Sequence, residues 1–360
     1  MEHGKRTPPF AMRFVAWGDS RTNMKNLFII GNGFDLHHNV PCSYDDYKVY
    51  LKNNGLDWVA DFYDNNFLPF DLPEEYTKIH KGLEDCHGDR KKYGTVLAKN
   101  YWLLPKLNTW RCLEAMLGYV NGISDGPAAV NFANIITTKI SDWMKDEINT
   151  KVPKKSRLKM PTSDASYLTF NYTETLEKSC NIPSELVNHI HNKVGQQLIF
   201  GHANYEAIQD TAQPISVWPT GNPMIDNAVQ NTAASFNANK YMERYFKGCL
   251  KDVNQIAQKN KAYFQSLAGV ERIYVLGHSL SSVDYVYFNE IDKVAPSAKW
   301  FICYYDKSSK EDIEETSIYK QIKKKAVFIT WKDVDSMFGP WYVRLPYKAM
   351  KYFKSLFSFI

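Results

Sequence analysis

The chain has 360 residues, of which 44% are apolar, so it can bury the core of one large domain or two modest ones. The net charge of +5 is mild, and no run of about 18 apolar residues occurs, which argues against a membrane-spanning helix. The six cysteines are scattered without a C-x-x-C pair, and no secretory leader is recognisable. We therefore expect a cytoplasmic protein with reduced thiols.

The N-terminal segment, residues 1–23, lacks hydrophobic periodicity, and we expect it to be a disordered extension. An α/β domain is predicted over residues 24–360, beginning with a strand at Leu27–Ile30 that runs into a glycine-rich turn. A dinucleotide fingerprint would place a third glycine at position 36, where Leu36 stands. The glycines at 31 and 33 can let the backbone approach a phosphate, or can simply build a tight strand-to-helix turn.

Short runs rich in Ile, Val, Phe and Tyr alternate with helical patterns along the rest of the chain. The further predicted strands are Tyr167–Phe170, Val187–His191, Gln197–Phe200, Arg272–Leu276, Trp300–Tyr305 and Ala326–Thr330. Apolar residues at helical spacing predict helices within 129–152 and 240–267. Residues 44–160 hold no convincing strand and are predicted to form a helical insertion after the first strand, and the polar segment 203–239 an irregular loop. This order predicts a three-layer, Rossmann-like α/β fold with a parallel sheet.

Five predicted strands end in small or polar residues, where a parallel sheet carries its ligand site. These ends are Gly31-Asn32-Gly33-Phe34-Asp35, Asn171-Tyr172-Thr173, His189-Ile190-His191-Asn192, Gly201-His202 and Gly277-His278-Ser279, the last followed by Asp284. Asparagine can hold a ribose hydroxyl or a water, and histidine is the usual general base. We therefore expect these ends to meet around one crevice.

Each of these residues also has a structural interpretation. Asp35 can cap the helix that follows it, and Thr173 can be the N-cap of a helix in "TETLE". His189 and His191 share one strand face, so one of them is expected to be structural. The pairs His37-His38 and Cys86-His87 lack partners at metal-ligand spacing, and we predict no metal site.

The sequence "GHSLS" at Gly277 is similar to a nucleophile elbow but lacks its last glycine, because Ser281 stands there. His278 is the last histidine of the chain, so the order serine-then-histidine of α/β-hydrolases is impossible. Ser279 is instead interpreted as a phosphate or ribose contact, or as a helix cap.

These strand-end blocks resemble the signature blocks of the AbiH family of bacterial abortive-infection proteins, which act against bacteriophage. The blocks are "LFIIGNGFDLHHNVPCSYDDY", "NTWRCLEAML", "YLTFNYTETLE", "IHN", "LIFGH" and "IYVLGHSLSSVDYVYF", in the family's order from about Met24 to about Tyr305. One departure is His191-Asn192, where the family usually has His-Gly.

The layout is also similar to that of sirtuin-like NAD-consuming effectors, with Thr173 standing where that group often has Asp. This resemblance implies a sirtuin-like sheet, Asn171 and His191 as catalytic residues, and Gly31, Gly33, Gly277 and Ser279 as nucleotide contacts. To these contacts we add Asn32, Asp35, Thr173, His278 and Asp284 from their positions at the strand ends.

The resulting hypothesis is an anti-phage effector that hydrolyses NAD, its substrate, at the nicotinamide–ribose bond without a metal. A nucleotide-sensing module without turnover is a second hypothesis. A nuclease or nucleic-acid-binding effector is a third, prompted by the basic patches that begin at Lys151 and Lys323. A nucleotide ligand, a phage-derived trigger and self-association are the partners we consider, and no membrane is expected.

Overall fold

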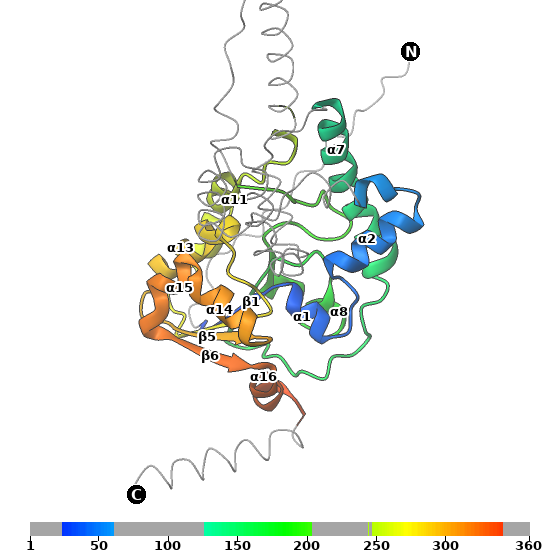
Figure 1. Cartoon of the computed structure of the whole chain (residues 1–360). Coiled ribbons are helices and arrows are strands. Elements are labelled where there is room, and N and C mark those ends of the chain that lie inside the picture. Colours follow the sequence, from blue (N-terminus) through cyan, green and yellow to red (C-terminus); the bar gives the residue numbers. More distant parts are fainter. Residues whose placement is uncertain (1–23, 61–125, 204–243, 245–246, 341–360) are drawn as a thin grey trace, which may run out of the picture.

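The computed structural model describes residues 24–60, 126–203, 244 and 247–340 (Figure 1). The predicted extension 1–23, residues 61–125 of the predicted insertion, and all but the start of the predicted loop 203–239 lie outside the described residues. Within the described part, no helix is long and apolar enough to cross a bilayer.

A six-stranded parallel sheet forms the centre of the molecule, in the order β3-β2-β1-β4-β5-β6. Its strands are β1 (Asn26–Ile30), β2 (Ala165–Thr169), β3 (Val187–His189), β4 (Arg272–Leu276), β5 (Lys299–Tyr304) and β6 (Ala326–Thr330). Ile30 lies opposite both Thr169 and Leu276, so the central three strands end level with one another. The chain reverses its direction of travel across the sheet between β1 and β4, which opens a crevice at their carboxyl ends.

Helices cover both faces of this sheet (Figure 1). They are α1 (Asn32–His37), α2 (Tyr44–Asn53), α7 (Gly126–Trp143), α8 (Thr175–Lys178), α11 (Val253–Lys259), α12 (Lys261–Gln265), α13 (Tyr285–Val294), α14 (Lys307–Glu315), α15 (Ser317–Ile322) and α16 (Trp331–Phe338). A π-helical turn, Met144–Ile148, continues α7, and short 3-10 turns occupy Ser184–Leu186, Ser282–Asp284 and Lys323–Lys325.

The alternation of side chains along β1 divides the core between the two faces. Leu27 and Ile29 pack with residues of α11, α12, α13 and α15, whereas Phe28 and Ile30 pack with residues of α8 and α16. The helices α2 and α7 share a third core built on Tyr47, Ile140 and Trp143. The predicted three-layer α/β sheet is therefore confirmed.

Two of the predicted strands, Arg272–Leu276 and Ala326–Thr330, have the observed bounds, and the others that form are shifted by one or two residues. The predicted strand Gln197–Phe200 is wrong, because this segment is irregular. It is held by the Ile199 N–H, which donates to the His191 carbonyl, and by the Tyr172 hydroxyl, which donates to the Ile199 carbonyl.

The predicted continuous helix within 240–267 is also wrong. Residues 249–252 leave the helix, and the Lys251 N–H donates to the His202 carbonyl at 2.8 Å in a short parallel bridge. A new helix, α11, begins at Val253 with Asp252 as its side-chain cap. Tertiary pairing with His202 thus overrides the helical spacing of the sequence. In the described parts of 44–160, by contrast, the regular elements are helical, as predicted.

Candidate functional site

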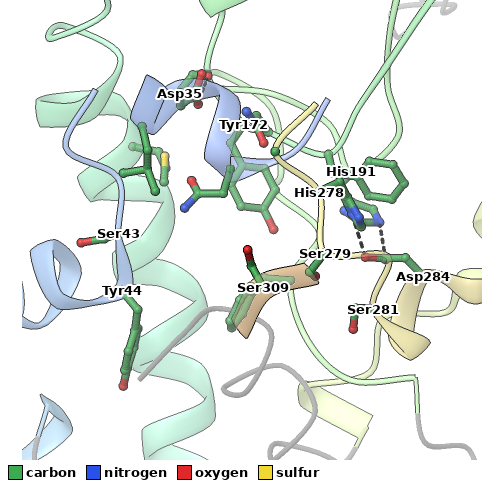
Figure 2. A pocket seen from close by; sticks show the side chains of 18 of the residues that line it. Asp35, Ser43, Tyr44, Tyr172, His191, His278, Ser279, Ser281, Asp284 and Ser309 are labelled. Atoms are coloured by element: carbon green, nitrogen blue, oxygen red, sulfur yellow. Dashed lines mark hydrogen bonds and ion pairs between the residues drawn. The ribbon is translucent and has the colours of Figure 1, made fainter. Parts of the chain in front are cut away.

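A cavity of about 400 Å³ lies at the carboxyl ends of the strands, a volume typical of small-molecule sites (Figure 2). It is lined by Asn32, Asp35, Leu36, Ser43, Tyr44, Met144, Phe170, Asn171, Tyr172, Thr173, His191, Phe200, Gly277, His278, Ser279, Ser281, Asp284, Ser309 and Asp312. Segments that follow β1, β2, β3 and β4 therefore meet around one crevice, as the sequence predicts. Residues of α2 and α14 complete the wall, and no motif in the sequence marked them.

The glycine-rich turn after β1 packs directly against the turn after β4. A Cβ atom on Gly31 would lie 2.6 Å from the Gly277 carbonyl oxygen, and one on Gly33 would lie 2.8 Å from the Gly277 Cα. Gly277 itself has a φ of +72°, which glycine adopts without strain. The Gly31 and Gly33 N–H groups donate to the carbonyls of Leu276 and Gly277. These two glycines thus build the tight turn, while Asn32 and Gly277 line the cavity.

Asn171 is held in place from three directions. Its backbone N–H donates to the Thr169 hydroxyl at 3.1 Å, and its side-chain Nδ2 donates to the Gly31 carbonyl at 3.0 Å. Its own carbonyl accepts from Nδ1 of His189 at 3.2 Å. This fixed geometry orients the amide in the cavity wall, as a group that positions a ligand or a water requires.

His189 and His191 have different environments. His189 also places its Nε2 2.9 Å from the Glu177 carboxylate, so both of its ring nitrogens have partners and it is the structural histidine of the pair. His191 lines the cavity, and its buried Nε2 has no hydrogen-bond partner among the described residues. A buried ring nitrogen without a partner is costly unless it serves a ligand.

A buried charged cluster lies behind His191 (Figure 2). The Asp284 carboxylate lies 3.1 Å from the Lys251 Nζ, 3.5 Å from the His278 Nε2 and 3.7 Å from the His191 Nε2. The Leu280 N–H donates to the His278 Nδ1 at 2.9 Å, so the proton of this ring is on Nε2, where it faces Asp284. Sequence reasoning missed Lys251, because nothing in the surrounding residues distinguishes it from a solvated lysine.

The cluster shifts the ionisation of its members in opposite directions. Burial alone would raise the pKa of Asp284, but Lys251 and the two histidines lower it well below its usual range. Burial, together with the positive charge of Lys251, lowers the pKa of His191 to about 3 against the opposing pull of Asp284. His191 is therefore an uncharged ring at neutral pH.

Asp35 is buried in the wall of the same cavity, on the α1 side. Its Oδ2 accepts from the Thr173 hydroxyl at 2.6 Å, and the Thr175 hydroxyl donates to that of Thr173 at 3.1 Å. Its Oδ1 has no hydrogen-bond partner in the described part of the chain. Burial raises the pKa of Asp35 to about 6, although the hydrogen bonds from Thr173, Thr175 and Asn171 oppose the shift.

The capping roles considered for three of these residues are wrong. Gly31 precedes α1 without a side-chain cap, so Asp35 does not cap it. Glu174, not Thr173, is the residue at the start of α8. The hydroxyl that accepts at the turn after β4 belongs to Ser281, which receives the Val283 N–H.

Among the described residues, no group of His, Cys, Asp and Glu side chains has an arrangement that could hold a metal ion. His37 contacts Asp335 and Arg157 and stacks on Trp331, with the ring centres 4.0 Å apart. Both ring nitrogens of His38 are engaged, one by the Phe34 carbonyl and one by Ser156. Cys86 and His87 lie outside the described residues.

A comparison with family models matches residues 27–304 of this chain to the model described as bacteriophage abortive infection AbiH. Comparisons with curated proteins and with solved structures return no match. The matched region holds the whole of β1 to β4 except Asn26, nearly all of β5, and every cavity residue that precedes α14. The chain therefore belongs to the bacteriophage abortive infection AbiH family.

Proposed function

We propose that this protein is an anti-phage effector whose cavity binds NAD and hydrolyses it at the nicotinamide–ribose bond. Family membership supports the role in abortive infection. The observation that carries the chemistry is the meeting of Asn171 and His191, from the ends of two neighbouring strands, in one cavity. Both side chains are the types that position and deprotonate a water at an electrophilic sugar carbon.

The position of the cavity supports a dinucleotide ligand. The strand order β3-β2-β1-β4-β5-β6 reverses at β1 and β4, and dinucleotide-binding sheets of the same order hold their ligand at that reversal. Asn32 and Asp35 from the β1 side and Gly277 and Ser279 from the β4 side line the cavity there. A sirtuin-like arrangement of the ligand is part of this proposal.

The charge of the lining favours a substrate with a cationic end. The cavity residues include three aspartates, Asp35, Asp284 and Asp312, and no lysine or arginine occurs among those the structure describes. The pyridinium ring of NAD is a cation that aromatic walls such as Phe170 and Tyr44 also attract. A polyanion such as RNA or DNA would be repelled by this lining, which weighs against the nuclease hypothesis.

The reaction can be written with these groups. The bond between the ribose C1′ and the pyridinium nitrogen breaks, and its electron pair stays on nicotinamide, which leaves as a neutral molecule. A water held by Asn171 forms the new bond to C1′, and its proton passes to a base at the cavity wall. His191 is the base proposed from the sequence, and its low pKa makes it a weak one before substrate binds. Asp35, with a pKa of about 6, is the second candidate for this proton.

The direct test measures nicotinamide release from NAD by the purified protein and by the Asn171→Ala variant. We expect a loss of about 10²–10³-fold in the variant, the range for removal of one positioned hydrogen-bonding group at a reacting centre. Asn188→Ala is the matched control, because the Asn188 amide is half-buried on β3 but bonds Asn260 outside the cavity. Equal release from wild type and Asn171→Ala would sink the proposal.

The same pair of proteins separates turnover from sensing. Cells carrying either form would be challenged with phage, and their NAD measured together with survival. We expect NAD to fall only with the wild type. Calorimetric binding of NAD that leaves the ligand intact, in the presence of infected-cell extract, would instead identify a nucleotide sensor.

A further inference from the structure

Lys251 occupies an unusual position for a lysine, because its side chain has no exposed surface. The break between the two helical segments puts it there. Its N–H is tied to the His202 carbonyl at 2.8 Å, and its own carbonyl accepts from the Val253 N–H at 2.8 Å. The backbone is thus fixed on both sides, and the side chain is directed to the Asp284 carboxylate behind the cavity.

The three basic groups around Asp284 compete for one negative charge. The Lys251 Nζ is the nearest at 3.1 Å, ahead of the His278 Nε2 at 3.5 Å and the His191 Nε2 at 3.7 Å. If Lys251 and Asp284 are both ionised and both rings are neutral, the cluster carries no net charge. A proton on either ring would add an uncompensated positive charge where the His191 side chain is only 3% exposed, which is unfavourable.

We propose that Lys251 is a positioning residue that takes the charge of Asp284 and thereby keeps the His191 ring uncharged and available to the cavity. Without the ammonium group, the carboxylate would draw a proton onto one of its two histidines to restore neutrality. This assignment gives a reason for a buried lysine beside the cavity, which the NAD hypothesis alone does not.

An uncharged ring matters for the proposed function, on which the purpose of this device rests. A neutral imidazole can accept a hydrogen bond or a proton from water or ribose, whereas an imidazolium cannot. An imidazolium would also repel the pyridinium cation of NAD in a low-dielectric cavity. The ionisation of His191 itself, however, can be measured without any substrate.

The groups that act on His191 come from three elements. Lys251 precedes α11, His278 follows β4, and Asp284 lies at the start of α13. The Tyr287 ring of α13 also contacts His191, with the ring centres 5.7 Å apart. Of these, Lys251 and His278 disfavour a positive charge on His191, and Asp284 favours it, so removal of Lys251 changes the sign of the balance.

The experiment is an NMR titration of histidine rings labelled at Cε1, with the His191 signal assigned from the His191→Gln spectrum. We expect the wild-type His191 signal to stay at its neutral position from pH 8 down to about pH 5. In Lys251→Met it should titrate with a midpoint raised by one unit or more, while Lys251→Arg, which keeps the charge, should behave as the wild type. In Lys251→Met/Asp284→Asn, which removes both charges, the ring should again stay neutral.

A wild-type His191 that titrates at the ordinary midpoint of about 6.5 would overturn the inference, even if Lys251→Met fails to fold. An unchanged His191 midpoint in a folded Lys251→Met would also overturn it. The NAD proposal fails separately, through an absence of nicotinamide release from a wild type whose His191 is shown to be neutral.

Discussion

Asp35 and Asp284 are both buried in the wall of one cavity, with exposed fractions of 1% and 4%, yet their environments differ. Asp35 receives a hydroxyl of Thr173 on one oxygen and has no partner on the other among the described residues. Asp284 faces an ammonium group and two imidazoles. Burial raises the pKa of the first carboxyl to about 6, and Lys251 lowers that of the second despite the same burial.

The difference shows that neutral hydroxyl donors do not offset the desolvation of a buried carboxylate, whereas one buried cation does. Pairs of titratable groups with opposite shifts in one cavity are typical of sites that move protons. Here Asp284 is a permanent anion that serves its neighbours. Asp35 is a group that can exchange a proton near neutral pH.

The largest expected effect comes from removing the charge of Asp284. Asp284→Asn leaves the Lys251 ammonium buried without its counter-charge, so we expect a loss of about 3–5 kcal/mol in the free energy of unfolding at pH 7. Urea denaturation followed by circular dichroism measures it. Glu271→Gln is the control, because its ion pair with Lys25 is exposed on both sides and should contribute less than about 1 kcal/mol. Equal losses in the two variants would contradict the contrast drawn here.

Asp35→Asn should have the opposite sign. The folded-state pKa of about 6 lies above the model value of 3.8, so the folded protein binds this proton more tightly than the unfolded chain does. The contribution of Asp35 to stability is therefore most favourable below pH 4, falls as the pH rises from about 4 to 6, and stays low above that window. We expect Asp35→Asn to be more stable than the wild type at pH 7 by about 1–3 kcal/mol.

The measurement for Asp35→Asn is the free energy of unfolding from urea titrations at several pH values between 4 and 7. The advantage of the variant should shrink towards pH 4, where the wild-type carboxyl is already protonated. A constant difference across this range, or a less stable variant at pH 7, would show that Asp35 is ionised without penalty.

The contrast between the two aspartates also marks how far the sequence alone could lead. Alternating apolar runs predicted the strands, because residues such as Leu27 and Ile29 must be buried on one face and Phe28 and Ile30 on the other. The parallel sheet then required the polar ends after β1, β2, β3 and β4 to meet, which placed Asn171, His191 and both aspartates in one site. This step needs only local pattern and chain topology.

Lys251 and the segment around Gln197 could not be found in the same way. Both depend on contacts between residues far apart in the chain. The His202 carbonyl holds Lys251 outside its expected helix, and Tyr172 fixes Ile199 in an irregular segment in place of the expected strand. Spacing rules describe how a segment buries its own apolar face and carry no information about such pairings. The opposite pKa shifts of Asp35 and Asp284 depend on these same long-range contacts.

The smallest expected effect tests the one polar partner that Asp35 has. Thr173→Val removes the hydroxyl that donates to Oδ2 at 2.6 Å while nearly keeping the volume of the side chain. Because this bond lowers the pKa of Asp35, its loss should raise that pKa further above 6 and cost about 1 kcal/mol more at pH 7 than at pH 4, where the carboxyl is protonated in both proteins. Unfolding in urea at the two pH values measures the difference. Thr138→Val, which removes an exposed hydroxyl bonded to the Asn134 carbonyl, should show the same small change at both. If Thr173→Val also proves independent of pH, the ionisation of Asp35 does not depend on Thr173, and its raised pKa must be attributed to burial alone.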